Sequence, residues 1–461
     1  MAFVRKSSLA VAVSVALVAC TSAPSAPPAS QEPPAKTSEA PVSTPAVPNI
    51  ERAEPARPRS IKVGVIEPLT GPLATHGIDN TDGFNFYLAS VNHAIADRSI
   101  EPVLVDSGAN VATALAKAKE LVEGEHVDLL MGLDTASECL AVAEYANRQR
   151  QPLAITGNCG IQNLPAGQFT TRFTYTPSGE VDSAADWAAK NGFRKAILIA
   201  TDGRRGIETS DAFASAFIAR GGQIVQELHP PRGTADFGPY VAQLNRAADI
   251  AVVFLPGANA GYFGEQYLSA HKLPILDLFG HMTTGVTLSR LGDKAVGVVS
   301  VSSYIDNFDA PGNRQFVRAW RAKYGDRPVT SDVAAGYVAG QVLEAAVEQI
   351  AGKVQDSDAL LQALYYTDVE TVKGRVRLDG DRDVVQSTYV YRLAKQGRGY
   401  ANQLLQTYTD VGRTWDRTPQ QLASFQFGGY RGTWVGMTKA QLGDVVTHRD
   451  LYQYFGPSEI R

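Results

Sequence analysis

The sequence predicts an α/β protein with two doubly wound lobes, each a parallel sheet covered by helices on both faces. Two observations support this class. From residue 61 onward, apolar strand-like runs alternate with amphipathic helical patterns, as they do in βαβ units. The runs are also too numerous for one sheet of ordinary size, which favours two lobes.

Residues 1–19 have the pattern of a secretory signal, with two basic residues, an apolar run and small residues in that order. The run is too short to span a membrane. Its end, from Leu17 to Cys20, resembles the bacterial lipobox, in which the cysteine becomes the lipidated first residue of the mature protein. An ordinary cleaved signal with a chance cysteine is the alternative. Thr21 after Cys20 implies an outer-membrane anchor if the organism has such a membrane.

Residues 20–58 are dominated by Pro, Ala, Ser, Thr and Glu, a composition that buries too little apolar surface to fold. We expect an extended tether that reaches on the order of 100 Å, at about 3.1 Å per residue. With 43 Lys and Arg against 47 Asp and Glu, the chain has no basic excess of the kind that binds nucleic acid. No later apolar run approaches the ~20 residues of a spanning helix. The lipid would therefore be the membrane attachment.

The globular part follows in regular order. The segments expected as strands are 61–69, 101–107, 127–133, 151–157, 195–201, 223–228, 249–257, 274–280 and 295–305. Helical patterns over 82–95 and 110–124 connect the first three. Segments 127–157 and 248–280 share the order strand, polar or Gly-rich loop, helix, Pro, strand, Gly. We interpret them as equivalent pieces of two similar lobes, and a chance match of two βαβ units is the alternative.

Several stretches together suggest a family. The opening "IKVGVIEPLTGPLATHGIDNTDGFNFYLASVN" contains a Thr70-Gly71-Pro72 turn, then Gly77, then Asn92. The stretches "VDLLMGLDTAS", "TSDVAAGYVAGQVLEAAV" and "KGRVRLDGDRD" follow in order. Over roughly residues 60–410 this set resembles the Leu/Ile/Val-type (type I periplasmic) solute-binding proteins of ABC transporters. The order of the stretches, and not any single motif, carries the resemblance.

The resemblance implies two lobes joined by a three-segment hinge, with the solute held between them. The expected boundaries are 1–19 for the signal, 20–58 for the tether, 59–177 and 304–366 for lobe 1, 178–303 and 367–410 for lobe 2, and 411–461 for a C-terminal extension of unknown role. The implied function is capture of an amino acid or other small carboxylate by a lipid-anchored monomer in the periplasm, for an ABC permease in the inner membrane. A sensor of the same fold that signals to a membrane partner is the alternative.

The first-lobe site is expected where two strands end. In parallel sheets, ligands bind beyond the carboxyl ends of the strands, where helix N-termini offer free N–H groups. The resemblance implies a carboxylate-binding loop of Asp134, Thr135, Ala136 and Ser137. The neighbouring wall would consist of Thr156, Gly157 and Asn158. Capping of the following helix by Thr135 or Ser137 is an alternative that is compatible with binding.

The second-lobe site is expected in the loops that follow three strands. Arg205 stands where the family often has Tyr, and its planar guanidinium would suit an acid group or an aromatic carboxylate. Gly257 and His281 lie in the loops after two later strands. A solvated Arg205 and a packed His281 are the alternatives. Two tyrosines, Tyr175 and Tyr337, are expected either to stack on the solute or to lie in the core. Val338 after Tyr337 departs from the Asp that the family often has.

Cys139 and Cys159 are the remaining cysteines after Cys20, and in an exported protein they suggest a disulfide. Free thiols are the alternative. An enzyme is the least favoured class, because the sequence has no GxSxG elbow, no HExxH spacing and no phosphate loop beside "GLDTAS". We therefore expect binding without chemistry and without a metal or cofactor.

Overall fold

The computed structural model describes residues 59–160, 169–175, 177–270, 273–413, 415 and 433–442. The expected signal, the lipidated Cys20 and the tether lie outside these residues. Within them, no helix is both long enough and apolar enough to cross a membrane.

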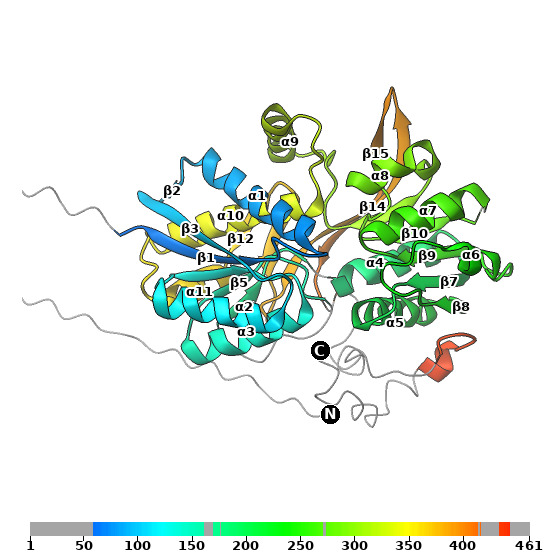
Figure 1. Cartoon of the computed structure of the whole chain (residues 1–461), viewed down its shortest axis with the longest axis horizontal. Helices are drawn as coiled ribbons and strands as arrows, with labels where there is room; N and C mark the ends of the chain where they lie inside the picture. The colour runs from blue at the N-terminus through cyan, green and yellow to red at the C-terminus, as the bar shows by residue number, and fades with distance from the viewer. Residues whose placement is uncertain are drawn as a thin grey trace, which may run out of the picture. The chain divides into compact units, whose positions relative to one another are not determined.

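Lobe 1 is built on a six-stranded sheet in the order β2–β3–β1–β4–β5–β6 (Figure 1). Its strands are β1 (Ile61–Glu67), β2 (Ala94–Ile95), β3 (Arg98–Asp106), β4 (Leu129–Gly132), β5 (Leu153–Ile155) and β6 (Thr170–Arg172). All neighbours pair in parallel except the short β2, which is antiparallel to β3. The expected class of parallel α/β lobe is confirmed.

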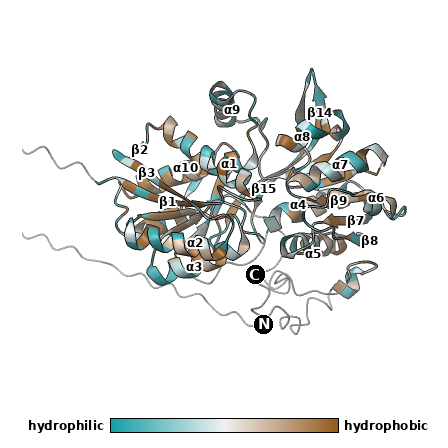
Figure 2. Cartoon of the chain, viewed as in Figure 1, coloured by the Kyte–Doolittle hydropathy of each residue, from teal (hydrophilic) through white to brown (hydrophobic). Residues whose placement is uncertain are grey.

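Helices cover both faces of this sheet. They are α1 (Ala74–Ser90), α2 (Val111–Lys119), a π-helical turn (Glu120–Gly124), α3 (Ala136–Gln149), α9 (Pro311–Tyr324), α10 (Ser331–Gln349) and α11 (Ser357–Tyr365). Val63 and Val65 of β1 point into a core with α1, α9, α10 and α11, whereas Ile66 packs with α2 and α3. Figure 2 shows the apolar strands at the centre of the lobe. This alternation of buried faces is what a doubly wound lobe requires.

A second sheet has nine strands in the order β12–β13–β14–β11–β10–β9–β7–β8, with β15 on β14; it forms lobe 2, and its first two strands, β12 and β13, pack on the lobe 1 core. The strands are β7 (Lys195–Ala200), β8 (Gln223–Leu228), β9 (Ile250–Phe254), β10 (Ile275–Leu278), β11 (Val299–Ser302), β12 (Asp368–Thr371), β13 (Gly374–Leu378), β14 (Val384–Gln396) and β15 (Gly399–Val411). The helices are α4 (Pro177–Lys190), α5 (Arg204–Ala219), α6 (Gly238–Ala242), α7 (Ala258–Ala270), α8 (Gly285–Leu291) and a 3₁₀ turn (Gly292–Ala295).

The two lobes share a connectivity. The path β3–β1–β4–β5–β6 in lobe 1 has the same order as β8–β7–β9–β10–β11 in lobe 2. Asp128 Oδ2 accepts a hydrogen bond from Lys62 N at 3.0 Å, and Asp249 Oδ1 accepts one from Lys195 N at 3.0 Å. Each carboxylate thus fixes the start of the first strand of its lobe. The interpretation of 127–157 and 248–280 as equivalent pieces agrees with this arrangement.

The chain crosses between the lobes three times, after β6, after β11 and after β13. Phe173 and Tyr304, which lie in the first two crossings, pack in the lobe 1 core. Val372 and Val376 belong to the same core although β13 pairs with β14 of the other sheet. Leu378 at the end of β13 and Val384 at the start of β14 also lie in that core, so the third crossing follows β13, later than the boundary at residue 367 that we expected.

Helices α1 and α10 approach each other very closely. A Cβ on Gly83 would lie 2.0 Å from Val333 O, and one on Gly336 would lie 1.8 Å from Asn80 O, so both positions require glycine. The helices run in the same direction. This packing brings the first turn of α1 beside the first turn of α10.

Two features differ from the sequence-based expectation. Helix α1 begins at Ala74, eight residues before the expected start at residue 82, because Gly77 and the polar residues after it belong to a helix face that packs on lobe 1. The long hairpin of β14 and β15 was not anticipated. Its strands alternate less regularly than a half-buried strand should, with two register shifts in their pairing.

Part of the C-terminal extension packs on lobe 2. Trp434 is 2% exposed and lies in a core with residues of α5 and β8. Its Nε1 donates to Asp211 Oδ1 at 2.6 Å and its backbone N to Glu227 Oε1 at 2.8 Å. Val435 forms a parallel bridge with Ile224 of β8. The described part of the extension, residues 433–442, is therefore a structural part of this lobe.

Candidate functional site

The carboxyl ends of the strands place a cluster of charged side chains between the lobes. His76 in the first turn of α1 contacts Asp332 in the first turn of α10, with 3.3 Å between His76 Nδ1 and Asp332 Oδ2. Tyr175 Oη, from the first crossing, donates to Asp332 Oδ1 at 2.5 Å. Arg205 at the start of α5 lies close enough to shift the pKa values of His76 and Asp134. We call His76, Asp134, Tyr175, Arg205 and Asp332 the inter-lobe cluster.

The charge states of the lobe 1 members follow from their neighbours. The carboxylate of Asp332 raises the pKa of His76 to about 9, against the cost of burial, so His76 is a cation at neutral pH. Burial alone would raise the pKa of Asp332, but His76 and Tyr175 outweigh it and the pKa is lowered. Asp332 is therefore an anion, paired with His76.

Asp134 and Glu67 lie deeper. Burial raises the pKa of Asp134 to about 6, and the nearby cations His76 and Arg205 limit the rise. Its Oδ1 accepts from Asn158 N at 3.1 Å, while its buried Oδ2 has no hydrogen-bond partner. Glu67 at the end of β1 is fully buried, and burial together with Asp134 and Asp332 raises its pKa well above the usual range. Burial and the neighbouring carboxylates thus favour the protonated form of Glu67.

The loop of residues 134–137 is shaped by a capping box. Thr135 Oγ1 accepts from Glu138 N at 3.3 Å, and Glu138 Oε2 accepts from Thr135 N at 3.0 Å. Thr135 thus serves the helix cap that we gave as the alternative. Ser137 is exposed, whereas Ala136 is partly exposed. Of the two hydroxyl-bearing residues, Ser137 is the more exposed.

The loop of residues 156–158, which follows β5, is fixed by contacts with the rest of lobe 1. Thr156 O accepts from Asn80 Nδ2 at 3.1 Å and from Thr174 Oγ1 at 2.5 Å. A Cβ on Gly157 would lie 2.1 Å from Leu133 O, so only glycine fits there. Asn158 contributes its backbone N–H to Asp134. Thr156 therefore uses its carbonyl oxygen within the protein, and Gly157 allows the close approach of the loop to Leu133.

Lobe 2 contributes Arg205 and an aromatic surface. The guanidinium of Arg205 lies 5.7 Å from the ring centre of Phe254. The rings of Phe254, Phe279 and His281 have centroids 5.4 to 6.2 Å apart. Burial, with His76 and Arg205 acting in the same direction, lowers the pKa of His281 to about 3. His281 is therefore neutral and extends this aromatic surface, and it lies within electrostatic reach of the cluster.

Two expected contacts lie elsewhere. Tyr337 packs on Phe316 and Tyr87, with ring centroids 4.3 Å and 5.0 Å away, and belongs to the lobe 1 core. The expectation that it stacks on a solute is corrected, because five residues along a helix turn a side chain by about 140° from Asp332. Gly257 is exposed, has a left-handed φ of +64° and has open space around it, and no contact ties it to the cluster.

Sequence reasoning missed several neighbours of the cluster. They are Glu67, His76, Phe254, Phe279 and Asp332. Glu67 could have been found, because it is an acid at the carboxyl end of a predicted strand. Asp332 is an acid in the first turn of a predicted helix. No local signal marks His76, whose place depends on the close packing of α1 and α10.

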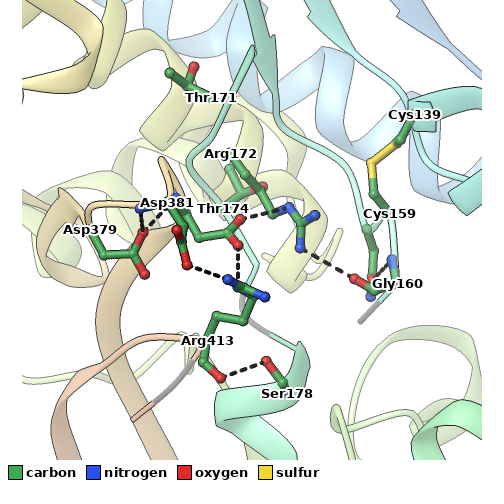
Figure 3. A network of polar contacts seen from close by, with 12 residues as sticks. Cys139, Cys159, Gly160, Thr171, Arg172, Thr174, Ser178, Asp379, Asp381 and Arg413 are labelled. Carbon is green, nitrogen blue, oxygen red and sulfur yellow. Dashed lines mark hydrogen bonds and ion pairs between the residues drawn. A yellow bond between two sulfur atoms is a disulfide. The ribbon is translucent and has the colours of Figure 1, made fainter. Parts of the chain in front are cut away.

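Cys139 and Cys159 form a disulfide with 6.0 Å between their Cα atoms, and both are buried (Figure 3). The bond joins α3 to the loop after β5, and Gly160 O in that loop accepts from Arg172 Nη1 at 3.4 Å. Arg172 in turn pairs with Asp383 at 3.2 Å. The loop held by the disulfide is thus connected, through Arg172 and Asp383, to the third crossing.

Arg413, where the extension begins, joins the same network (Figure 3). Its Nε lies 2.9 Å from Asp383 Oδ2, and it also pairs with Asp381. Its backbone oxygen accepts from Ser178 Oγ at 3.2 Å at the start of α4. The first and third crossings are therefore connected by buried charges.

A pocket of about 200 Å³ adjoins the cluster. It lies between α8, the β14–β15 hairpin, the second crossing and the loop before α10. Its wall includes Phe279 and Ser331, which neighbour His281 and Asp332 in the chain. Among the described residues, no group of three His, Cys, Asp or Glu side chains is arranged to hold a metal ion.

Two α/β lobes with one connectivity, three crossings and a charged cluster between the strand ends define a hinged solute-binding protein. A family model described as periplasmic binding protein matches residues 60–398. The chain belongs to this family and is a type I periplasmic solute-binding protein of ABC transporters. Its relatives are binding components of transport systems.

Individual relatives cover the same part of the chain. A Leu/Ile/Val-binding protein homologue from Brucella abortus (strain 2308) is 28% identical over 361 residues, 76% of this chain and 92% of that protein. The structure of an ABC transporter substrate-binding protein from Sphaerobacter thermophilus is 29% identical with a TM-score of 0.73, over 77% of this chain and 99% of the other. A solute-binding protein from Rhodopseudomonas palustris BisB5, solved with 3,4-dihydroxybenzoic acid, is 26% identical with a TM-score of 0.70. The match covers 76% of this chain and 98% of the other.

Proposed function

We propose that the protein captures a small monocarboxylate, preferably an aromatic acid, between its lobes for an ABC importer. The observation that carries the proposal is a pair of cations from opposite lobes, His76 and Arg205, which lie within electrostatic reach of each other. Asp332 pairs with His76, and Arg205 is attracted to Asp134 but forms no ion pair with any cluster member, all of which the structure describes, so a close anionic partner would have to come from outside the cluster. A solute carboxylate between the lobes would supply it through paired N–H donors.

The aromatic preference rests on the surface beside Arg205. Phe279 and the neutral His281 are partly exposed and present ring edges to which another ring can pack at 4.5–7 Å, with the buried Phe254 behind them. Two R. palustris solute-binding proteins, each 26% identical to this chain, were solved in complex with 3,4-dihydroxybenzoic acid and p-hydroxybenzoic acid. They support an aromatic acid as the solute class.

An amino acid is the second candidate, and one observation favours it. The buried Asp134 Oδ2 has no donor, and an α-ammonium group would provide one. The Leu/Ile/Val-binding names of the relatives agree with this candidate.

A screen of matched solutes tests both candidates. Binding to the native state alone adds about 2.7 kcal/mol of stability at a hundredfold excess over Kd, enough to shift a melting curve. We expect benzoate and 4-hydroxybenzoate to shift the curve and benzamide, which lacks the charge, to leave it unchanged. Leucine as the strongest ligand would support the second candidate. Equal shifts by benzoate and benzamide, or none by any of these solutes, would reject the carboxylate proposal.

We also propose that Cys20 carries a lipid and that residues 20–58 tether the lobes to the membrane. The lipobox-like Leu17–Cys20 supports this. Cells that express Cys20→Ala should release the protein from the membrane fraction, whereas the native chain should stay with membranes after a high-salt wash. Release of both proteins by salt would contradict the anchor.

A further inference from the structure

We propose that the pocket beside the second crossing receives the body of the solute, and that the solute is a monocarboxylate with an aromatic body longer than one benzoate ring. This inference rests on the proposed function, since it assigns the carboxylate end to the inter-lobe cluster. It adds a second contact region that the family resemblance does not supply.

The pocket and the cluster share walls. Phe279 lines the pocket, and its ring lies 6.2 Å from that of His281. Ser331 also lines the pocket and directly precedes Asp332. A solute with its carboxylate at Arg205 would therefore extend past Phe279 into the pocket. The volume of about 200 Å³ leaves room for such a body.

The residues that line the pocket indicate which charge the part of the solute inside it can have. None of the lining residues is Lys, Arg or His, so a second carboxylate on the solute would find no cation there. The single acid, Asp306, is engaged by Arg321 Nη2 at 3.1 Å, and burial raises its pKa. A dicarboxylate and a cationic body are both disfavoured. The body is uncharged.

The lining also selects against a polyol. Four rings, those of Phe279, Tyr304, Tyr391 and Tyr400, line the pocket together with Leu288 of α8 and Leu393 of β14. Two of the hydroxyls already have partners, because Tyr304 Oη donates to Asn313 Oδ1 at 2.9 Å and Tyr400 Oη to Asp293 Oδ1 at 2.7 Å. The hydroxyls of Thr284 and Ser289, which also line the pocket, donate to backbone oxygens, so a body with many hydroxyls would recover little of its lost hydration. An aromatic body suits this surface.

One polar atom on the hairpin wall is unmatched. Among the lining residues, all of which belong to the described part of the chain, Asn402 Oδ1 is the buried side-chain atom without a hydrogen-bond partner. A hydroxyl on the solute body would donate to it after a small adjustment of the side chain. A phenolic acid is therefore favoured over the same acid without the hydroxyl.

Calorimetry on the full chain with benzoate, 3-phenylpropanoate and 3-(4-hydroxyphenyl)propanoate tests the inference. Because two added methylenes bury further apolar surface, we expect 3-phenylpropanoate to bind about tenfold more tightly than benzoate. The hydroxylated acid should bind a further few-fold more tightly, about threefold to tenfold. Ala401→Leu, which narrows the pocket, should weaken 3-phenylpropanoate about tenfold more than benzoate.

Gln403→Leu is the matched control, since Gln403 lies two residues further along the same strand, is exposed and does not line the pocket. If Ala401→Leu does not fold, Ser289→Leu narrows the pocket from α8. Equal affinity for benzoate and 3-phenylpropanoate, or equal losses in the narrowed pocket, would overturn this inference and leave the carboxylate proposal standing. Failure of all three acids to bind would overturn the carboxylate proposal and this inference with it.

Discussion

Lobe 1 and lobe 2 share a strand order but present different side chains at the ends of their strands. Lobe 1 contributes acids and a histidine, namely Glu67, His76, Asp134 and Asp332. Lobe 2 contributes Arg205 and a set of rings. The difference shows that the fold determines where a solute lies, whereas a few residues after each strand determine which solute is held.

The lobes also differ in how they are braced. Lobe 1 has the disulfide of Cys139 and Cys159 and the capping box of Thr135 beside its site. Lobe 2 has no cysteine, and the extension around Trp434 packs into its core instead. Each brace can be removed separately, so the contribution of each lobe can be measured.

The largest effect is expected from Trp434→Ala. The change removes a side chain that is 2% exposed and leaves Asp211 without its donor, so we expect the free energy of unfolding to fall by about 3–5 kcal/mol. Urea unfolding measures it. Val435→Ala, at a side chain 42% exposed, is the control and should cost little. Equal midpoints for Trp434→Ala and the native chain would show that the extension does not stabilise lobe 2.

The paired change Cys139→Ala and Cys159→Ala tests the brace of lobe 1. The cysteines are 20 residues apart, and opening a loop of this size costs about 3 kcal/mol in the chain-entropy model. Reduced and oxidised native protein should differ by a similar amount in urea. If alkylation of the unfolded protein adds the same mass to Cys139 and Cys159 with and without prior reduction, the bond is contradicted.

Arg205→Ala should affect binding and not stability. It removes the cation that lobe 2 offers to the solute, so we expect a loss of about 2 kcal/mol in affinity for a bound carboxylate, or about thirtyfold in Kd. Calorimetry measures the loss. Arg246→Ala, at an exposed arginine of the same lobe, is the control. Unchanged affinity in Arg205→Ala would place the carboxylate elsewhere.

The corresponding test in lobe 1 is a pH series. The folded pKa of His76 is about 9, above its usual 6.5, so the stability from its pairing with Asp332 is fully present below pH 6.5 and is lost as the pH rises through 9. We expect carboxylate affinity to fall in the same range, about fivefold. The fall in affinity with rising pH should disappear in His76→Gln and should remain in His93→Gln, which changes an exposed histidine. If the affinity of His76→Gln still falls over this pH range, a titrating group other than His76 causes the fall.

Ser137→Ala should have the smallest effect. The capping box uses Thr135, so the helix start stays intact and only an exposed hydroxyl is lost. We expect a loss of about 0.5–1 kcal/mol in solute affinity and no change in melting temperature. A large loss of stability would show that Ser137 contributes to the cap.

Much of the fold was predictable because parallel strands buried on both faces leave a clear apolar pattern. The strands at 61–67 and 250–254 were found within a few residues of their ends. The hairpin of β14 and β15 was not, because its side chains face a core, a crossing and solvent in turn, and no single period survives. The start of α1 was missed because its first turns face other helices with polar residues.

The site was predictable only where it follows a strand. Asp134 and Arg205 were singled out because each stands at the carboxyl end of a predicted strand. His76 and Asp332 are 256 positions apart in the chain, and their contact depends on glycines that let α1 and α10 approach. Tyr337 was misplaced because the direction of a helical side chain requires knowledge of the packing. Local patterns locate strand ends, but they do not locate contacts between distant helices.

The bridge between Val435 and Ile224 has a consequence for how the molecule behaves in a crowded compartment. β8 is the edge of the lobe 2 sheet, and an open edge offers unpaired N–H and C=O groups to any other extended chain. Here Gly436 N donates to Ile224 O at 3.0 Å, so the chain covers part of its own edge. The extension thus acts against strand exchange with neighbouring molecules, a protection that the solute-binding surface neither provides nor requires.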